Sequence, residues 1–156
     1  MDEVGSASIR TAGPRDADSV LRLWTTMVEE LDFPPDPEWQ SHAREWLLAH
    51  VDDGEHCHIP VVDMGGSVVA TAVGVLTVGV PNPYAPRGRS VHLTNVVTEP
   101  LFRGRGYASD LVRDVIAWAE RTGADRIDLS ASPDGLRIYE RLGFTRTVSP
   151  RLKHPL

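Results

Sequence analysis

Residues 91–108 read VHLTNVVTEPLFRGRGYA, and this stretch decides the fold. Its Val- and Thr-rich first half predicts a strand over 91–98, and apolar residues at helical spacing predict a long helix over about 106–122. In the intervening turn, Arg103–Ala108, two glycines let the backbone approach an anion, and two arginines can add charge-assisted hydrogen bonds. The helix dipole favours the same ligand. Taken alone, the turn is compatible with an anion site or with a plain tight connection.

The residues on both sides of this stretch predict an alternation of strands and helices. Gly65-Gly66 lies between two Val-rich runs and predicts a hairpin, and Ser132-Pro133 predicts a helix start. The expected elements are a strand at 8–11, helices at about 14–31 and 38–51, strands at 59–64, 67–80 and 91–98, a helix at 106–122, a strand at 126–130, a helix at 132–143, and strands at 144–148 and 151–154. This order predicts one domain over residues 1–156, an α/β fold with a mixed sheet that is antiparallel in its first half and has a parallel crossover.

Composition excludes several classes of protein. The 156 residues carry a net charge of -6 and a pI near 5.4, which argues against broad nucleic-acid binding. The longest apolar run, 68–80, is too short to span a bilayer and contains two glycines. Cys57 is the single cysteine, so an intrachain disulfide is excluded, and the acidic N-terminus has no features of a secretory signal. We therefore expect a cytoplasmic protein that binds neither nucleic acid nor membrane.

Two ordered motifs resemble those of the GNAT superfamily of acyl-CoA N-acyltransferases. The turn Arg103–Ala108 matches the family pattern Gln/Arg-x-x-Gly-x-Gly/Ala, and Tyr139–Phe144 matches Tyr-x-x-x-Gly-Phe at the family's separation. Ile9-Arg10 and Asp16-Ala17 are similar to the family's opening strand and helix, so the resemblance covers nearly the whole chain. It departs at Ser132, where the family often has an Asn that contacts CoA. The resemblance implies the order β-α-α-β-β-β-α-β-α-β, with a last strand that is short or completed by another subunit.

The resemblance also implies acetyl-CoA as co-substrate and acyl donor. In the family the pantetheine arm pairs with a splayed strand, the pyrophosphate binds the N–H groups of the turn, and a backbone N–H stabilises the oxyanion. Tyr139 would protonate the leaving thiolate, for which a phenol pKa of about 10 is suitable; a packed aromatic is the alternative. The implied donor-side residues are Val96, Val97, Thr98, Arg103, Gly104, Arg105, Gly106, Tyr107, Ala108, Ser109 and Ser132.

The reaction needs a base, because an amine acceptor arrives as an ammonium ion. His92 falls where some family members place a glutamate base, and imidazole titrates at about pH 6.5. A packed histidine is the alternative reading of His92, and Glu99 or a water relay are the other candidate bases. Glu29, Glu30 and Asp36 either attract a cationic acceptor or form a solvated face.

Three further features have two interpretations each. The tract His56-Cys57-His58 looks like a metal site, but alternate strand residues face opposite ways and no partner cluster follows, so we expect no metal. Cys57 could carry an acyl group, although buried cysteines are usually inert. The tryptophans at positions 24, 39 and 46 either line an acceptor pocket or pack in the core.

The acceptor side is expected to lie at two Pro-rich segments. Segments 33–37 and 81–86 should approach the same end of the sheet, where Tyr84 would contact the acceptor. The leading hypothesis is an N-acetyltransferase that moves an acetyl group to a primary amine of a small molecule or peptide by direct attack in a ternary complex. The alternative is a non-catalytic CoA-binding or regulatory module on the same fold. An unfilled sheet edge would favour a homodimer.

Overall fold

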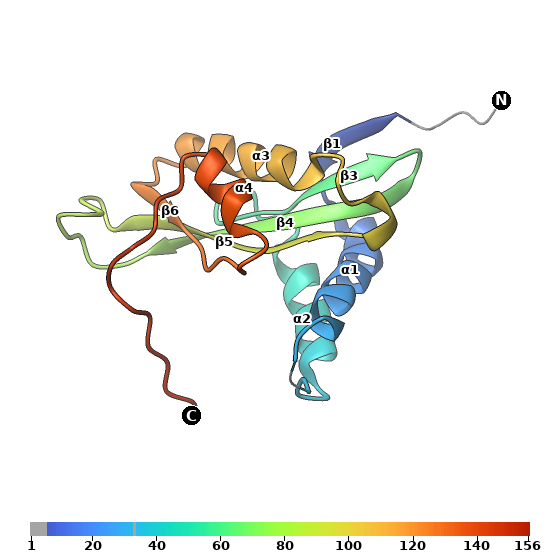
Figure 1. Ribbon diagram of the computed structural model, residues 1–156, viewed down its shortest axis with the longest axis horizontal. Helices are drawn as coiled ribbons and strands as arrows, with labels where there is room; N and C mark the ends of the chain where they lie inside the picture. Colours follow the sequence, from blue (N-terminus) through green and yellow to red (C-terminus); the bar gives the residue numbers. More distant parts are fainter. Residues whose placement is uncertain (1–5, 33) are drawn as a thin grey trace.

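The structure, a computed structural model, describes residues 6–32 and 34–156, and its centre is a mixed sheet (Figure 1). Neighbouring strands follow the order β1-β3-β4-β5-β6, and β2 also pairs with β4. All these pairs are antiparallel except β5 with β6. The strands are β1 (Ala7–Thr11), β2 (Cys57–His58), β3 (Pro60–Met64), β4 (Ser67–Val78), β5 (Arg89–Thr98) and β6 (Arg126–Asp128). The predicted mixed α/β fold with its parallel crossover is confirmed.

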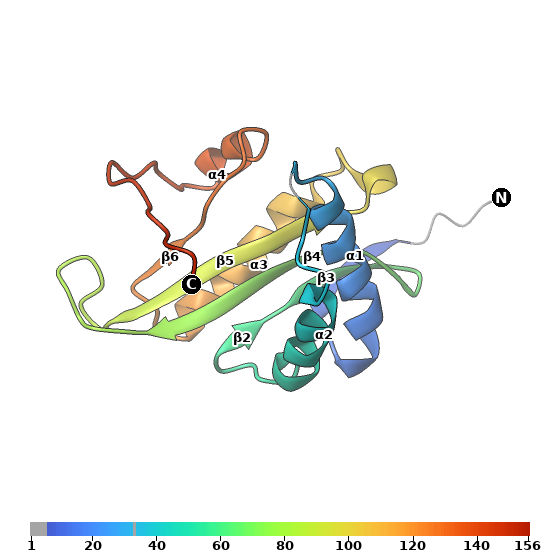
Figure 2. The same cartoon turned by 90° about the horizontal axis from the view of Figure 1, so that it is seen from below.

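The helices form a layer on each face of the sheet. They are α1 (Ala17–Glu29), α2 (Trp39–His50), α3 (Tyr107–Arg121) and α4 (Leu136–Arg141). Helix α3 covers one face, α1 and α2 cover part of the other, and α4 lies beyond the β5–β6 edge (Figures 1 and 2). None of the helices in the described part of the chain is both long and apolar enough to cross a membrane.

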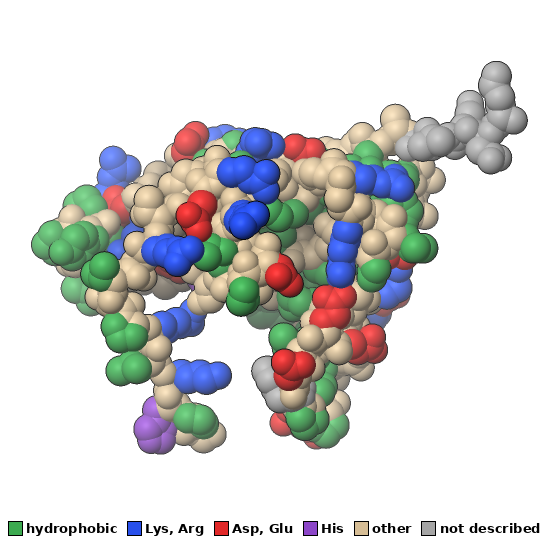
Figure 3. Space-filling view, in the orientation of Figure 1, with side chains coloured by type: hydrophobic (Ala, Val, Ile, Leu, Met, Phe, Trp, Pro, Cys, Tyr) green, Lys and Arg blue, Asp and Glu red, His purple; other side chains and the backbone are tan. Residues whose placement is uncertain are grey.

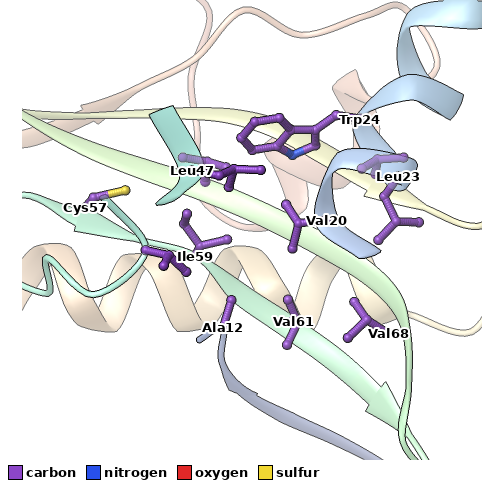
Figure 4. Packing of buried hydrophobic residues seen from close by; sticks show 12 residues of the cluster. Ala12, Val20, Leu23, Trp24, Leu47, Cys57, Ile59, Val61 and Val68 are labelled. Atoms are coloured by element: carbon purple, nitrogen blue, oxygen red, sulfur yellow. The ribbon is translucent and has the colours of Figure 1, made fainter. Parts of the chain in front are cut away.

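Each face of the sheet has its own hydrophobic core, because side chains alternate along the strands. On the α1–α2 face, Trp24 and Leu47 pack down onto strand residues such as Ile59 (Figure 4). On the α3 face, Leu111 and Val115 are fully buried against β4 and β5. Each strand residue therefore points to one of the two faces, and a ligand can contact its side chain only from that face.

Strand β5 contains a bulge that changes which residues face each layer. Val73 of β4 pairs with Thr94 and Thr71 pairs with Val97, so β5 has one more residue than its partner here. Asn95 takes up the extra length with φ of 51°, a conformation that Asn tolerates better than most residues. Thr94 therefore faces the α1–α2 layer before the bulge, and Val97 faces it after the bulge.

The same strand parts from β6 just before the bulge. Pairing between β5 and β6 runs from Ser90–Arg126 to His92–Asp128 and ends there. Pairing between β5 and β4 continues to Thr98. The last six residues of β5 therefore have an edge on the β6 side that no strand of the described chain covers. We call this uncovered edge of β5, on the side where α4 lies in Figure 2, the opening.

Two sequence-based expectations about the C-terminal part are wrong. Segments 144–148 and 151–154 form no strand in the described chain, and Val148 is fully exposed. Phe144 packs against the α3-side core, after which the chain turns away from the sheet (Figure 1). The alternating pattern of 144–148 has no neighbouring strand to pair with, and a strand without a ladder is not stable alone.

The start of the last helix is also later than expected. Helix α4 begins at Leu136 rather than directly after Ser132. Ser132 Oγ accepts a hydrogen bond from the N–H of Gly135 at 3.2 Å, so it caps the turn that precedes the helix. The prediction of Ser132 as the N-cap of the helix is therefore wrong, because Gly135 occupies that position, and the helix is three residues shorter at this end.

The two Pro-rich segments do not meet at one end of the sheet. The loop 81–86 closes the β4–β5 hairpin at the end remote from α1, whereas the α1–α2 connection lies on the other side of the molecule (Figures 1 and 2). Tyr84 is 81% exposed at the hairpin tip, and Phe33 lies outside the described residues. The expectation failed because β4 and β5 extend beyond the helices, which carries their hairpin away from the α1–α2 layer.

Candidate active site

The turn before α3 is open to an anion. Gly104 and Gly106 have φ of 80° and 84°, a region that favours glycine, and no atom lies within 4 Å of where a Cβ would be. Helix α3 begins at Tyr107, and no side chain caps it. The first N–H groups of a helix have no intrahelical acceptor, so those of Tyr107, Ala108 and Ser109 are available to a ligand. This geometry agrees with the anion-binding role predicted for the turn.

The two arginines of the turn are held differently. Arg103 Nη2 lies 2.6 Å from Glu30 Oε1, and its Nε donates to the carbonyl of Thr98 at 3.1 Å. Arg105 stacks on the ring of Phe102, with 5.0 Å between its Cζ and the ring centroid. Arg103 therefore ties the turn to α1 and β5, and Arg105 is the arginine of the turn whose donors can reach an anion.

The uncovered edge of β5 contains the three residues expected to pair with pantetheine. Val97 faces the α1–α2 core and Val96 packs toward the α3 core, so their backbone groups lie at the level of the sheet. Thr98 ends the strand, and its carbonyl already accepts the hydrogen bond from Arg103. Val96 and Val97 are therefore the better placed of the three to pair with an extended ligand in the opening.

Tyr139 lies on the α4 side of this opening. It packs against the α3-side core and meets the ring of Phe144 edge to face, with centroids 5.9 Å apart. Burial raises the pKa of Tyr139 above its ordinary value, so the phenol stays protonated across the neutral range. At neutral pH this half-buried phenol therefore carries a proton that it can donate.

His92 faces the α1–α2 side of the sheet and has a carboxylate partner. Its Nδ1 lies 2.7 Å from Asp128 Oδ1, and the two residues are paired in register across β5 and β6. An ionised carboxylate only accepts hydrogen bonds, so Nδ1 carries the proton. In the neutral ring this leaves the Nε2 lone pair free to accept a proton. Asp128 was not among the residues singled out from the sequence, because nothing local shows which strand pairs with it.

A pocket of about 210 Å³ opens on the same face of the sheet, beside the bulge. Val73, Val75, Thr94 and Asn95 from β4 and β5 form its floor, and Trp24, Ala43 and Trp46 from α1 and α2 form its wall. Val75 is the cross-strand neighbour of His92, so the floor of the pocket continues directly to the histidine. Of the three early tryptophans, Trp24 and Trp46 line this pocket, and Trp39 packs against the core beneath α1 and α2.

The other candidate residues are engaged elsewhere. Glu99 lies 3.6 Å from Arg22 Nη1, and Glu30 is paired with Arg103. Burial raises the pKa of Cys57 to about 12, so its thiolate is scarce at neutral pH. These contacts leave His92 as the candidate base that borders the pocket.

The tract around Cys57 does not converge on a common point. His56 contacts Asp53, and His58 contacts Asp114 of α3 at 2.6 Å. Within residues 6–32 and 34–156, no group of three or more His, Cys, Asp or Glu side chains is arranged to hold a metal.

Comparisons with known proteins identify the family. The acetyltransferase (GNAT) family model matches residues 21–144. A glucosamine 6-phosphate N-acetyltransferase of Trypanosoma brucei brucei is 30% identical over 89 residues, which are 56% of this chain and 55% of that relative. The chain thus matches about half the length of this curated relative.

Solved structures share the fold over nearly the whole chain. A predicted acetyltransferase from Clostridium acetobutylicum, solved with acetyl-CoA, has a TM-score of 0.86 at 19% identity, with 96% of each chain covered. A GCN5-related N-acetyltransferase from Ralstonia eutropha JMP134 has a TM-score of 0.82 at 23% identity, with 97% of this chain and 99% of that chain covered. Because the family model spans far more than half of the sequence, the chain belongs to the acetyltransferase (GNAT) family.

Proposed function

We propose that this protein is an N-acetyltransferase that transfers the acetyl group of acetyl-CoA directly to a primary amine. The observation that carries the proposal is the opening where β5 parts from β6, with the uncapped N-terminus of α3 at one end and His92 on its acceptor face. An extended thioester in this opening would have its phosphates at the helix N-terminus and its acyl group near the bulge. Family membership supports the same reaction.

The donor is bound mainly by backbone groups. The pyrophosphate takes the N–H groups from Gly104 to Ser109, with Arg105 adding charge, and the pantetheine arm pairs with Val96 and Val97. Arg103 acts on the donor indirectly, through its bonds to Glu30 and Thr98. Ser132 caps the turn before α4, so it supports the helix that carries Tyr139.

Side chains carry out two of the proton transfers that catalysis needs. His92 Nε2 takes a proton from the acceptor ammonium, and the resulting amine nitrogen attacks the thioester carbonyl carbon. A backbone N–H of the bulged strand stabilises the oxyanion of the tetrahedral intermediate. When the C–S bond breaks, Tyr139 gives its phenolic proton to the leaving thiolate. The nitrogen bonded to the carbonyl carbon still carries one extra proton after the attack, and it releases that proton to water as the intermediate collapses. The products are the neutral acetamide and CoA, and the two side chains recover their original states by proton exchange with water.

The test follows free thiol release from acetyl-CoA with a panel of amines, with Tyr139→Phe as the variant. We expect a fall in kcat of at least about a hundredfold with little change in acetyl-CoA affinity, because the variant lacks only the acidic proton. Turnover equal to that of the wild type would remove Tyr139 as the acid. Binding of CoA by calorimetry with no turnover on any amine would instead favour a non-catalytic CoA-binding module.

We further propose a single domain that acts in the cytoplasm, and a homodimer. The free, buried Cys57 is typical of a reducing compartment. The outer edge of β6, beside which residues 144–148 and 151–154 form no strand, and the exposed apolar residues Val148 and Leu152 favour pairing with a second copy. A mass near that of a monomer in light scattering at micromolar concentration would contradict the dimer.

A further inference from the structure

The pocket beside the bulge lies where the acceptor must bind, which makes its lining informative about the substrate. Thr94 and Asn95 form the end of the floor at the bulge, and Trp46 forms the wall on α2. His92 continues the floor past Val75. An amine nitrogen within reach of His92 and of a thioester near the bulge would direct its carbon skeleton into this pocket. The inference rests on the proposed acetyl transfer and deepens it.

The pocket is chemically uneven. Among the described residues that line it, none is charged, and the polar ones, Thr94 and Asn95, lie together and share a hydrogen bond of 3.0 Å. The remainder is aliphatic or aromatic. Trp46 is fixed by stacking on His50, with centroids 4.6 Å apart, and lies 6.2 Å from the Trp24 ring. The polar end suits an amine and the apolar end suits hydrocarbon.

The pocket is also small. An apolar cavity of about 150 Å³ is enough to bind benzene in another protein, whereas drug-sized ligands need about 300 Å³ or more. The volume here, about 210 Å³, fits one ring with a short arm to the nitrogen. A sugar phosphate fits poorly, because its hydroxyl groups and phosphate would lose water without gaining partners on an uncharged apolar wall.

Solvent reaches the acceptor face of the sheet beside the pocket, because the side chain of His92 is 35% exposed there. The underside of the molecule is hollowed between the α1–α2 layer and the C-terminal segment (Figure 3), so a small amine can approach the exposed strand face from solvent. The donor opening faces α4 instead (Figure 2). The two substrates therefore have separate approaches, as direct transfer in a ternary complex requires.

We propose that the acceptor is a compact primary amine of the benzylamine or alkylamine class, whose amino group is its only charged group. Its apolar ring or short chain binds between Trp24, Trp46 and Val75. The test measures kcat/KM for benzylamine, butylamine and glucosamine 6-phosphate, the last being the acceptor named for the Trypanosoma relative. We expect benzylamine to exceed glucosamine 6-phosphate by at least about a hundredfold. Preference for the sugar phosphate would overturn the inference and leave the transferase function intact. Absence of both turnover and acetyl-CoA binding would overturn both.

A matched pair of variants locates the acceptor. Ala43 lines the pocket, whereas Ala49 lies on the exposed side of the same helix. Ala43→Phe should raise the KM for benzylamine about tenfold or more because the new ring occupies its place, and Ala49→Phe should leave it unchanged. Acetyl-CoA affinity by calorimetry should stay within about twofold in both, which also shows that the variants fold. An unchanged KM for benzylamine in Ala43→Phe would refute the assigned pocket.

Indole N–H signals in a nitrogen–proton correlation spectrum give a readout that does not depend on turnover. Benzylamine is titrated into the CoA-saturated protein. The signals of Trp24 and Trp46 should shift, because a ring beside an indole changes its shielding, while that of Trp118 stays fixed. Trp118 lies on the α3 face and donates to the carbonyl of Gly54 at 2.9 Å. Shifts at Trp118 without shifts at Trp24 or Trp46 would place the amine elsewhere and refute the inference.

Discussion

Replacing Asp128 with Asn tests whether the histidine on β5 acts as the base. The 2.7 Å contact between Asp128 and His92 holds the proton on Nδ1. An Asn amide either accepts from Nδ1 without charge or donates to it, and the second arrangement moves the ring proton to Nε2. In both arrangements, the imidazolium that forms when the ring takes a proton from the acceptor is less stabilised than beside a carboxylate.

The geometry sets the size of the effect. The side chain of His92 is 35% exposed and that of Asp128 is 51% exposed. Breaking a fully buried ion pair costs about 3–5 kcal/mol, and an exposed pair contributes about 0–1 kcal/mol. A half-exposed pair should lie between these limits, at about 1.5 kcal/mol, which corresponds to about a tenfold fall in kcat. The KM for acetyl-CoA should not change, because Asp128 lies outside the donor turn.

The assay combines steady-state thiol release with the nitrogen chemical shifts of the His92 ring. The shifts report which ring nitrogen carries the proton, so they separate a positioning effect from general loss of structure. Asp53→Asn is the matched control, because Asp53 contacts His56 in a similar pair, at 3.2 Å, on the opposite side of β4 from β5. If Asp128→Asn keeps the wild-type kcat and the wild-type tautomer, Asp128 does not position the base.

Three further substitutions probe the turn and the core. Gly106→Ala should weaken acetyl-CoA binding in calorimetry about tenfold, because a side chain at φ of 84° costs about 1–2 kcal/mol. Arg10→Ala should lower the free energy of unfolding in urea by about 2–3 kcal/mol, because it leaves Asp16 buried without its partner. Arg10 holds the pKa of Asp16 below its usual range, so in the wild type this stabilisation is present at neutral pH and is lost as the pH falls below about 4. Gly74→Ala should lower the free energy of unfolding by about 1–3 kcal/mol, because its Cβ would lie 2.8 Å from Val115 Cγ1.

Control variants separate these effects from general damage. Gly66→Ala introduces the same backbone strain in the β3–β4 hairpin, so it should reduce stability and leave acetyl-CoA affinity unchanged. Gly79→Ala meets no atom within 4 Å and should be close to neutral. Equal losses of affinity in the Gly66 and Gly106 variants, or equal losses of stability in the Gly74 and Gly79 variants, would contradict the reasoning. If Arg10→Ala has the same free energy of unfolding as the wild type at pH 7, the ion pair does not contribute the stability assigned to it.

The local structure of the candidate donor site could be predicted from the sequence because its signals are local. The strand over 91–98, the glycines of the turn and the helix that follows all occur within one continuous stretch, and the backbone N–H groups proposed to bind the anion do not depend on distant residues. Local propensity also placed the hairpin at Gly65-Gly66 and the start of α3 to within a residue. These features need no knowledge of tertiary contacts.

The acceptor side could not be predicted in the same way, because its residues meet only through strand register and helix packing. Asp128 reads as an ordinary residue of a short strand until β6 is set beside β5. Ala43 and Val75 carry no functional signal, yet they help to form one pocket from α2 and β4. Asn95 had one weak signal, since an Asn within a Val- and Thr-rich run is unfavourable in a regular strand and is tolerated in a bulge.

The bulge at Asn95 explains why the proposed donor and acceptor sites meet at this point of the sheet. Without the extra residue, side chains of β5 would alternate regularly, and Val96 rather than Val97 would face the α1–α2 core together with Thr94. With the extra residue, Val97 packs into the α1–α2 core, and Thr94 and Asn95 stay at the floor of the pocket. Because a bulge also bends and twists its strand, it accounts for the loss of pairing with β6 that begins after His92. One added residue thus opens the edge proposed for the thioester and keeps the proposed base and the pocket together on the opposite side of the sheet from α3.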